Sequence, residues 1–171
     1  IDYLQTIPQI DNNKIAVAGH SRLGKTALWC AALDERFAVG VSNCSGCSGA
    51  ALSREKKGEK IKDIINQFSY WFCKNYQKYI DEEEKMPFDQ HFLLAAIAPR
   101  AVYVGSAYED RWADPKSEYL SCVAASKIYD FLGLKGIEKK QEVIKPSTNL
   151  MEGNIAYTCR EGTHFFSRDD W

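Results

Sequence analysis

The chain has 171 residues, of which 45% are hydrophobic and 26% charged, an ordinary globular composition with enough length to bury a sizeable core. Its 22 basic and 23 acidic residues give a net charge of −1, which argues against a nucleic-acid or anionic-membrane partner. No apolar run approaches the roughly 20 residues of a membrane span.

The order of the expected elements indicates a parallel α/β sheet. Residues 1–13 are typical of a helix end followed by a turn, and the apolar run in Lys14–Ala18 predicts a short buried strand. A helix over Thr26–Leu33 and a strand over Phe37–Ser42 then complete a β-α-β unit.

The rest of the chain continues the alternation. Residues 53–63 are highly charged and are expected to be solvated, whereas residues 134–150 are polar and give no clear pattern. The other expected elements are a loosely helical stretch over residues 64–79, a helix over residues 87–98, a strand over Ala101–Gly105, a helix over Lys116–Leu132 and a strand over Ile155–Cys159. Functional residues should gather at the carboxyl ends of these four strands.

The six cysteines are too few for a disulfide scaffold. Cys44-Ser-Gly-Cys47 is a C-x-x-C, but no second pair or paired histidine completes a zinc site. A structural role is therefore favoured over a redox or metal role, and a disulfide from either cysteine to a distant partner stays open.

The segment Gly19-His-Ser-Arg-Leu-Gly-Lys-Thr26 fits two incompatible sites. Its spacing satisfies G-x-x-x-x-G-K-[ST], in which Lys25 and Thr26 would hold phosphate and Mg²⁺. It also places Ser21 at a strand-to-helix turn, as in the nucleophile elbow of α/β-hydrolases, although Gly24 comes one residue later than in G-x-S-x-G. A P-loop protein also needs an apolar strand that ends in a Mg²⁺-binding aspartate, and no expected strand ends in this way.

An acid and a histidine in suitable loops favour the hydrolase. Glu109 and Asp110 follow the third strand, and His164 lies in the loop directly after the fourth. This is the order Ser…Asp…His of α/β-hydrolase triads. A serine hydroxyl needs a histidine to take its proton, and the histidine needs a carboxylate to fix its tautomer.

Four ordered motifs resemble those of the glucuronoyl esterases, carbohydrate esterase family 15. They are Gly19-His-Ser-Arg-Leu-Gly-Lys25, Pro87-Phe-Asp-Gln-His-Phe-Leu-Leu-Ala-Ala-Ile-Ala-Pro-Arg100, Glu109-Asp-Arg-Trp-Ala-Asp-Pro115 and Glu161-Gly-Thr-His164. The elbow of that family, G-[CH]-S-R-x-G-K, also has its second glycine one position late. The resemblance implies an α/β-hydrolase fold, a three-layer α/β/α sandwich. Residues 1–171 would be a single catalytic domain that lacks its N-terminal half.

The resemblance also implies roles for single residues. Ser21 would be the nucleophile, His164 the general base and Arg22 the support of the oxyanion. Contacts with the sugar would come from Lys25, Glu59 and Trp112. Glu59 lies in the charged stretch that is expected to be solvated, and Trp112 could equally be an ordinary core residue.

The acid of the triad departs from the family pattern. Many members carry a catalytic glutamate in the loop after the second strand, where this chain has Asn43-Cys-Ser-Gly46. No acid occurs between Arg36 and Arg54. We therefore expect the acid in the loop after the third strand, with Asp110 as the first choice and Glu109 as the alternative.

The expected activity is hydrolysis of (4-O-methyl-)glucuronic acid esters that join glucuronoxylan to lignin alcohols, by a monomer that needs no metal or organic cofactor. The family resemblance points to a secreted or periplasmic protein. Three alternatives stay open: an acetyl-xylan or other carbohydrate esterase, a non-catalytic carbohydrate-binding relative, and a P-loop nucleotide-binding protein.

Overall fold

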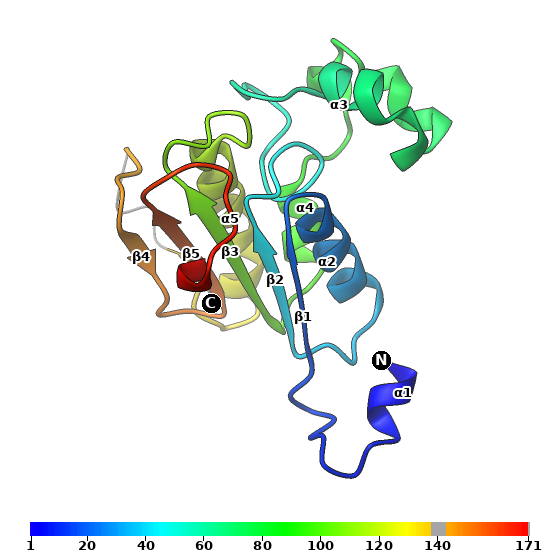
Figure 1. The fold of residues 1–171 in the computed structure, drawn as a ribbon, viewed down its shortest axis with the longest axis vertical. Coiled ribbons are helices and arrows are strands. Elements are labelled where there is room, and N and C mark those ends of the chain that lie inside the picture. Colours follow the sequence, from blue (N-terminus) through cyan, green and yellow to red (C-terminus); the bar gives the residue numbers. More distant parts are fainter. Residues whose placement is uncertain (138–142, 171) are drawn as a thin grey trace.

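A computed structural model of the protein describes residues 1–137 and 143–170 (Figure 1). Five strands form one sheet in the order β1-β2-β3-β5-β4. The four parallel strands are β1 (Ala16–His20), β2 (Val39–Asn43), β3 (Ala101–Ala107) and β5 (Ile155–Arg160). The short β4 (Thr148–Leu150) pairs antiparallel with β5 at one edge. The carboxyl ends of the parallel strands therefore lie along one rim of the sheet.

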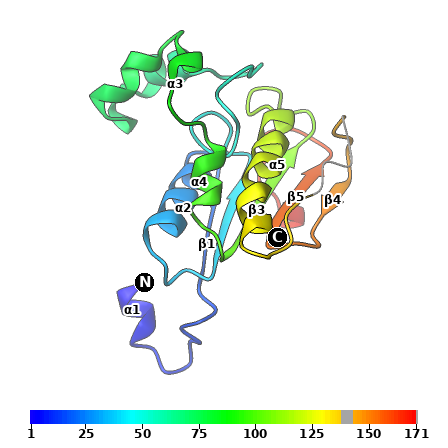
Figure 2. The ribbon, with the colours of Figure 1, turned by 180° about the vertical axis from the view of Figure 1, so that it is seen from behind.

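Helices cover one face of this sheet, and they are α2 (Arg22–Leu33), α4 (His91–Ala95) and α5 (Pro115–Phe131) (Figures 1 and 2). Alternate strand residues point toward these helices and form the main core. Its fully buried side chains include Leu28, Leu94, Tyr129, Val102, Val104, Ile155 and Tyr157. The opposite face carries the C-terminal segment with the 3₁₀ turn η4 (Arg168–Asp170). The described residues thus supply the sheet and one helical layer of the expected sandwich.

An insertion between β2 and α4 stands beyond the rim of the sheet (Figure 1). It contains α3 (Ile61–Phe68) and the 3₁₀ turns η1 (Ser69–Trp71), η2 (Lys74–Tyr79) and η3 (Glu83–Lys85). The buried face of α3 forms a second, smaller core with Cys47, Met86 and several aromatic side chains. This core holds the insertion in a defined shape, so the insertion can form one wall of a site at the rim of the sheet.

The four predicted strands are confirmed, with ends that differ by no more than two residues. The helix after β1 begins at Arg22, earlier than predicted, because no loop separates it from the turn at Ser21. The stretch over residues 64–79 divides into the end of α3 and two 3₁₀ turns. Sequence analysis missed β4, since three residues cannot show a periodic pattern. Part of the stretch over residues 134–150, to which the sequence assigned no element, lies outside the described residues, namely residues 138–142.

The charged stretch over residues 53–63 is only partly solvated, so that prediction is wrong for part of it: Glu55, Lys57, Lys60 and Lys62 are exposed, but other charged residues are not. Lys56 and Glu59 are only 5% and 8% exposed, and Ile61 is fully buried. The stretch folds against the loop after β3, where the Glu59 N–H donates to the Trp112 carbonyl at 2.9 Å. The buried residues of this stretch therefore have partners that are distant in sequence. None of the helices in the described part of the chain has the length and apolar character that crossing a bilayer requires.

Candidate active site

Ser21 stands at a sharp turn between β1 and α2. Its φ of 57° and ψ of −123° lie outside the regions that side-chain-bearing residues ordinarily adopt, as at a strained nucleophile elbow. Gly19 permits this turn, because an ideal Cβ there would lie 2.1 Å from the Leu23 carbonyl oxygen. Gly24 lies inside α2, where a Cβ would approach Ser42 Oγ at 3.0 Å. The late glycine thus allows α2 to pack closely on β2.

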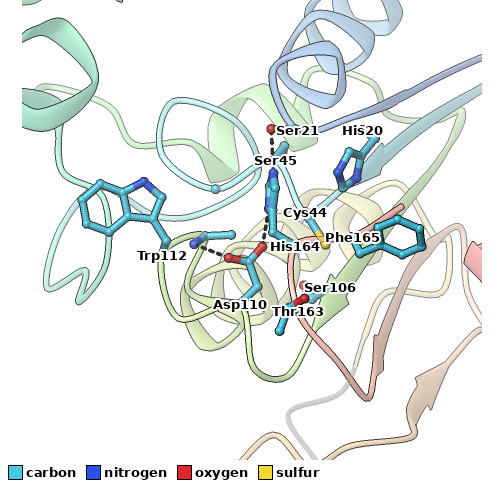
Figure 3. A network of polar contacts seen from close by, with 12 residues as sticks. His20, Ser21, Cys44, Ser45, Ser106, Asp110, Trp112, Thr163, His164 and Phe165 are labelled. Carbon is cyan, nitrogen blue, oxygen red and sulfur yellow. Dashed lines mark hydrogen bonds and ion pairs between the residues drawn. The ribbon is translucent and has the colours of Figure 1, made fainter. Parts of the chain in front are cut away.

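His164 joins Ser21 to Asp110 (Figure 3). Its Nε2 lies 2.8 Å from Ser21 Oγ, and its Nδ1 lies 2.6 Å from Asp110 Oδ2. The second carboxylate oxygen of Asp110 accepts a hydrogen bond from the Ala113 N–H at 3.1 Å, which fixes the orientation of the carboxylate. Asp110 is 5% exposed. The three side chains form a continuous relay from a buried acid to a hydroxyl group.

The protonation states of this relay suit base catalysis. The hydrogen bond with Asp110 raises the pKa of His164 above its ordinary 6.5, although desolvation opposes the shift. Burial by itself raises the pKa of Asp110, but hydrogen bonds from His164 and the Ala113 N–H hold that pKa below 3.8. Asp110 is therefore ionised at neutral pH. Its charge keeps the proton of neutral His164 on Nδ1 and leaves Nε2 to accept the Ser21 proton.

Glu109 and His20 have other surroundings. No polar contact in the described part of the chain joins Glu109 to His164; the Glu109 side chain is exposed, and its N–H donates to the Gly162 carbonyl at 3.0 Å. The ring of His20 lies 4.8 Å from that of His164 and stacks at 5.0 Å on Phe166. Burial lowers the pKa of His20, which favours a neutral ring that supports the histidine loop.

A cavity of about 360 Å³ opens beside Ser21 and His164. Residues from the rim loops and the insertion line it, and every predicted site residue except Glu109 is among them: Ser21, Arg22, Lys25, Glu59, Asp110, Trp112 and His164. Trp112 is 53% exposed, so it is not a core residue. Figure 3 shows its indole on one side of the serine–histidine pair.

Lys25 and Glu59 give the cavity a charged wall that is poorly solvated. Lys25 Nζ donates to the Ser45 carbonyl. Desolvation lowers the pKa of Lys25, and the Glu59 charge counteracts this shift. Desolvation raises the pKa of Glu59, while Lys25 and a hydrogen bond with the Trp112 side chain counteract it. A donor and an acceptor placed beside an aromatic ring suit the hydroxyl groups and apolar face of a sugar.

The elbow geometry excludes the P-loop alternative. Because α2 begins directly after Ser21, no loop of backbone N–H groups is present to cradle phosphates. Thr26 Oγ1 donates to the Arg22 carbonyl within the helix at 3.2 Å, and Lys25 is directed to Ser45. The residues that would bind phosphate and Mg²⁺ are therefore used inside the fold.

Cys44, Asp110 and His164 bring possible metal-ligand atoms within 4.8 Å of one another. Asp110 and His164 already bind each other, which favours proton transfer over coordination as the chemistry of this group. All six cysteines are free thiols. Within the described residues, neither Cys44 nor Cys47 forms the disulfide to a distant partner that the sequence left open.

The cavity-lining residues that sequence analysis missed include three from the insertion: Gln67 and Phe68 at the end of α3, and Trp71 in η1. Phe68 and Trp71 stack with ring centroids 4.1 Å apart. The stretch that holds them is rich in aromatic residues, and its pattern does not tell which of them face the small core and which face the cavity.

Comparison with known proteins places this geometry in a family. A family model described as "Glucuronyl esterase, fungi" matches residues 1–133. This chain belongs to the glucuronoyl esterase family. The match confirms the family that the four sequence motifs indicated, and with it the predicted α/β-hydrolase fold.

Three relatives illustrate how this glucuronoyl esterase chain compares with others. It is 48% identical to carbohydrate esterase MZ0003 of an unknown prokaryotic organism, over 100% of this chain and 39% of that protein. It is 35% identical to 4-O-methyl-glucuronoyl methylesterase 1 of Wolfiporia cocos, over 78% of this chain and 35% of that protein. The solved structure of a promiscuous CE15 esterase from a marine bacterial metagenome superposes with a TM-score of 0.94 and 46% identity, over 99% of this chain and 42% of that one. The chain thus spans about two fifths of the length of MZ0003 and of the metagenomic esterase.

Proposed function

We propose that this chain carries the catalytic triad of a serine esterase that hydrolyses esters of glucuronic acid. The observation that carries the proposal is the relay from Asp110 through His164 to Ser21, at 2.6 and 2.8 Å, beside a cavity with sugar-binding chemistry. The printed name of the Wolfiporia cocos relative, a 4-O-methyl-glucuronoyl methylesterase, supports a uronate ester as the substrate.

The first half of the reaction is an attack by Ser21 Oγ on the uronate carbonyl carbon. His164 Nε2 takes the hydroxyl proton, and the ionised Asp110 stabilises the imidazolium that forms. Arg22 lines the cavity, and in this proposal its N–H at the start of α2 and its positive charge stabilise the developing oxyanion. When the tetrahedral intermediate collapses, His164 returns the proton to the departing alcohol and Ser21 is left acylated.

The second half repeats these steps with water. His164 takes a proton from the water molecule, whose oxygen attacks the acyl-enzyme carbonyl, and the proton then returns to Ser21 Oγ as free uronate leaves. In this proposal Lys25 and Glu59 bind sugar hydroxyls, and Trp112 packs on the sugar ring. The natural ester would join 4-O-methyl-glucuronate on xylan to a lignin alcohol.

Three substrates and two variants test the proposal. The methyl and benzyl esters of glucuronate and an acetylated xylo-oligosaccharide are compared as substrates for the wild type, Ser21→Ala and the matched control Ser69→Ala, whose serine is exposed outside the cavity. We expect both uronate esters to be cleaved, the acetyl ester to be a poor substrate, and only Ser21→Ala to lose activity. Preferential acetyl release, or uronate ester cleavage that survives Ser21→Ala, would refute the proposal.

A further inference from the structure

Lys56 is a buried cation that the mechanism above does not use. It is 5% exposed and reaches from the insertion to the acid loop, which we define as residues 110–114 between β3 and α5. Its Nζ donates to the Ala113 carbonyl at 2.7 Å and to the Trp112 carbonyl at 3.3 Å. Both carbonyls belong to the loop that carries the triad acid and the cavity tryptophan.

The neighbours of Lys56 bind the same loop through their backbone. The Lys57 N–H donates to Asp114 Oδ2 at 2.9 Å, and the Glu59 N–H donates to the Trp112 carbonyl at 2.9 Å. Between them, an ideal Cβ at Gly58 would lie 2.2 Å from the Trp112 carbonyl oxygen, so the two segments approach more closely than any side chain would allow. Residues 56–59 therefore fix the position of the acid loop along its length.

The charges around Lys56 explain why a cation is kept there. Desolvation lowers the pKa of Lys56, and the carboxylates of Asp114, Glu118 and Glu59 raise it. Lys56 in turn contributes to the lowered pKa of Asp110. Glu118 is fully buried, and a buried carboxylate is costly unless a positive charge or hydrogen bonds compensate it. Glu118 accepts hydrogen bonds from the Gly46 N–H and the Ser106 hydroxyl, and Lys56 adds a positive charge at the point where the acid loop, the insertion and α5 meet.

We propose that Lys56 is a positioning residue that holds Asp110 and Trp112 in place relative to Ser21 and His164; its effect on turnover rests on the proposed function. The link to Asp110 is short, because the Ala113 carbonyl binds Lys56 while the Ala113 N–H binds Asp110 Oδ1. A displacement of about 1 Å at a catalytic group can cost roughly 100-fold in rate. The long stem and three donors of lysine allow one ammonium group to hold two carbonyls.

The test compares Lys56→Met, Lys56→Arg and the matched control Lys57→Met. Methionine keeps the length of the lysine stem without its donors, and Lys57 is the exposed neighbour that binds the acid loop only through its backbone. We expect Lys56→Met to lower kcat/KM roughly 10- to 100-fold through both kcat and KM. Lys57→Met should stay within about twofold of wild type, and Lys56→Arg should recover at least half of the loss on a logarithmic scale.

A second readout needs no substrate. The proton shared by His164 Nδ1 and Asp110 should give a low-field ¹H NMR signal in the wild type, persist in Lys57→Met, and be lost or broadened in Lys56→Met. If Lys56→Met does not fold, the low-field signal is measured in Lys56→Arg. Retention of the signal in Lys56→Arg supports the proposal, and loss of the signal in folded Lys56→Arg overturns it. Wild-type kcat/KM in folded Lys56→Met, or equal impairment of the Arg and Met variants, would also overturn it. Should the wild type cleave no uronate ester, the proposed function fails while the NMR result still reports on Lys56.

Discussion

Replacing Asp110 by asparagine should inactivate the relay through a change of tautomer. The Ala113 N–H donates to Asp110 Oδ1, so an asparagine at this position would keep its amide oxygen there and direct its NH₂ group toward His164 Nδ1. Two N–H groups cannot face each other. The imidazole proton would therefore move to Nε2, and Nε2 could no longer accept the proton of Ser21.

The expected loss in kcat is about 10⁴-fold, the effect that an equivalent change has in a serine protease triad. This factor corresponds to about 5.4 kcal/mol of lost transition-state stabilisation. The structure supports a loss of this size, because Asp110 is 5% exposed and water has little access to replace its charge.

The pH dependence gives an independent check. Activity requires neutral His164, and Asp110 raises the pKa of His164, so the wild-type acid limb of kcat/KM should lie above pH 6.5. In Asp110→Asn the cause of the shift is gone, and the limb should move to lower pH. Steady-state hydrolysis of the benzyl ester between pH 4 and 9 measures both effects, with Glu109→Gln as the matched control. A loss below tenfold in Asp110→Asn, or an equal loss in Glu109→Gln, would refute the assignment of the acid.

Three further substitutions probe the ring contact, the elbow and the histidine loop. Trp112→Ala should raise KM roughly 3- to 10-fold in steady-state kinetics, which is the value of one aromatic contact. Because the Trp112 side chain is 53% exposed, the same substitution should change the free energy of unfolding in urea by less than about 0.5 kcal/mol. Gly19→Ala should destabilise the fold by about 3 kcal/mol in urea unfolding, since its Cβ would lie 2.1 Å from the Leu23 carbonyl oxygen, and an unchanged midpoint would contradict this account of the elbow. Arg160→Met should lower kcat roughly 10- to 100-fold with a smaller change in KM, because Arg160 donates to the carbonyls of Glu161 and Thr163 in the loop that carries His164. If the loss in kcat is matched by the fraction of protein unfolded at the assay temperature, the cause is unfolding and this account of Arg160 is wrong.

The sequence allowed the rim of the site to be predicted because each of its residues follows a strand. Ser21, Asp110 and His164 lie in the connections that follow β1, β3 and β5, and parallel strands bring their carboxyl ends together whatever lies between them. The preference for Asp110 over Glu109 came from its alignment with the usual acid position. The structure gives the physical difference, since the Asp110 side chain is buried toward the histidine and that of Glu109 faces solvent.

The insertion could not be predicted in the same way. A lysine and a glutamate in a charged stretch are usually solvated, and only contacts with the acid loop, more than 50 residues away in sequence, explain why Lys56 and Glu59 are buried. The irregular turns after α3 likewise follow from the packing of aromatic side chains on a small core. Local periodicity carries no information about either arrangement.

The register between β2 and β3 has a consequence for where a triad acid could be placed. Asn43 pairs with Gly105, and the N–H of Cys44 donates to the Gly105 carbonyl at 2.8 Å, so the two strands end side by side. Cys44, in the loop after β2, comes within 4.8 Å of the ligand atoms of Asp110 and His164. A carboxylate grafted onto either loop would thus meet the same imidazole. In the proposed triad, the loop after β2 and the loop after β3 are therefore equivalent positions for the acid, with Ser21 and His164 unchanged.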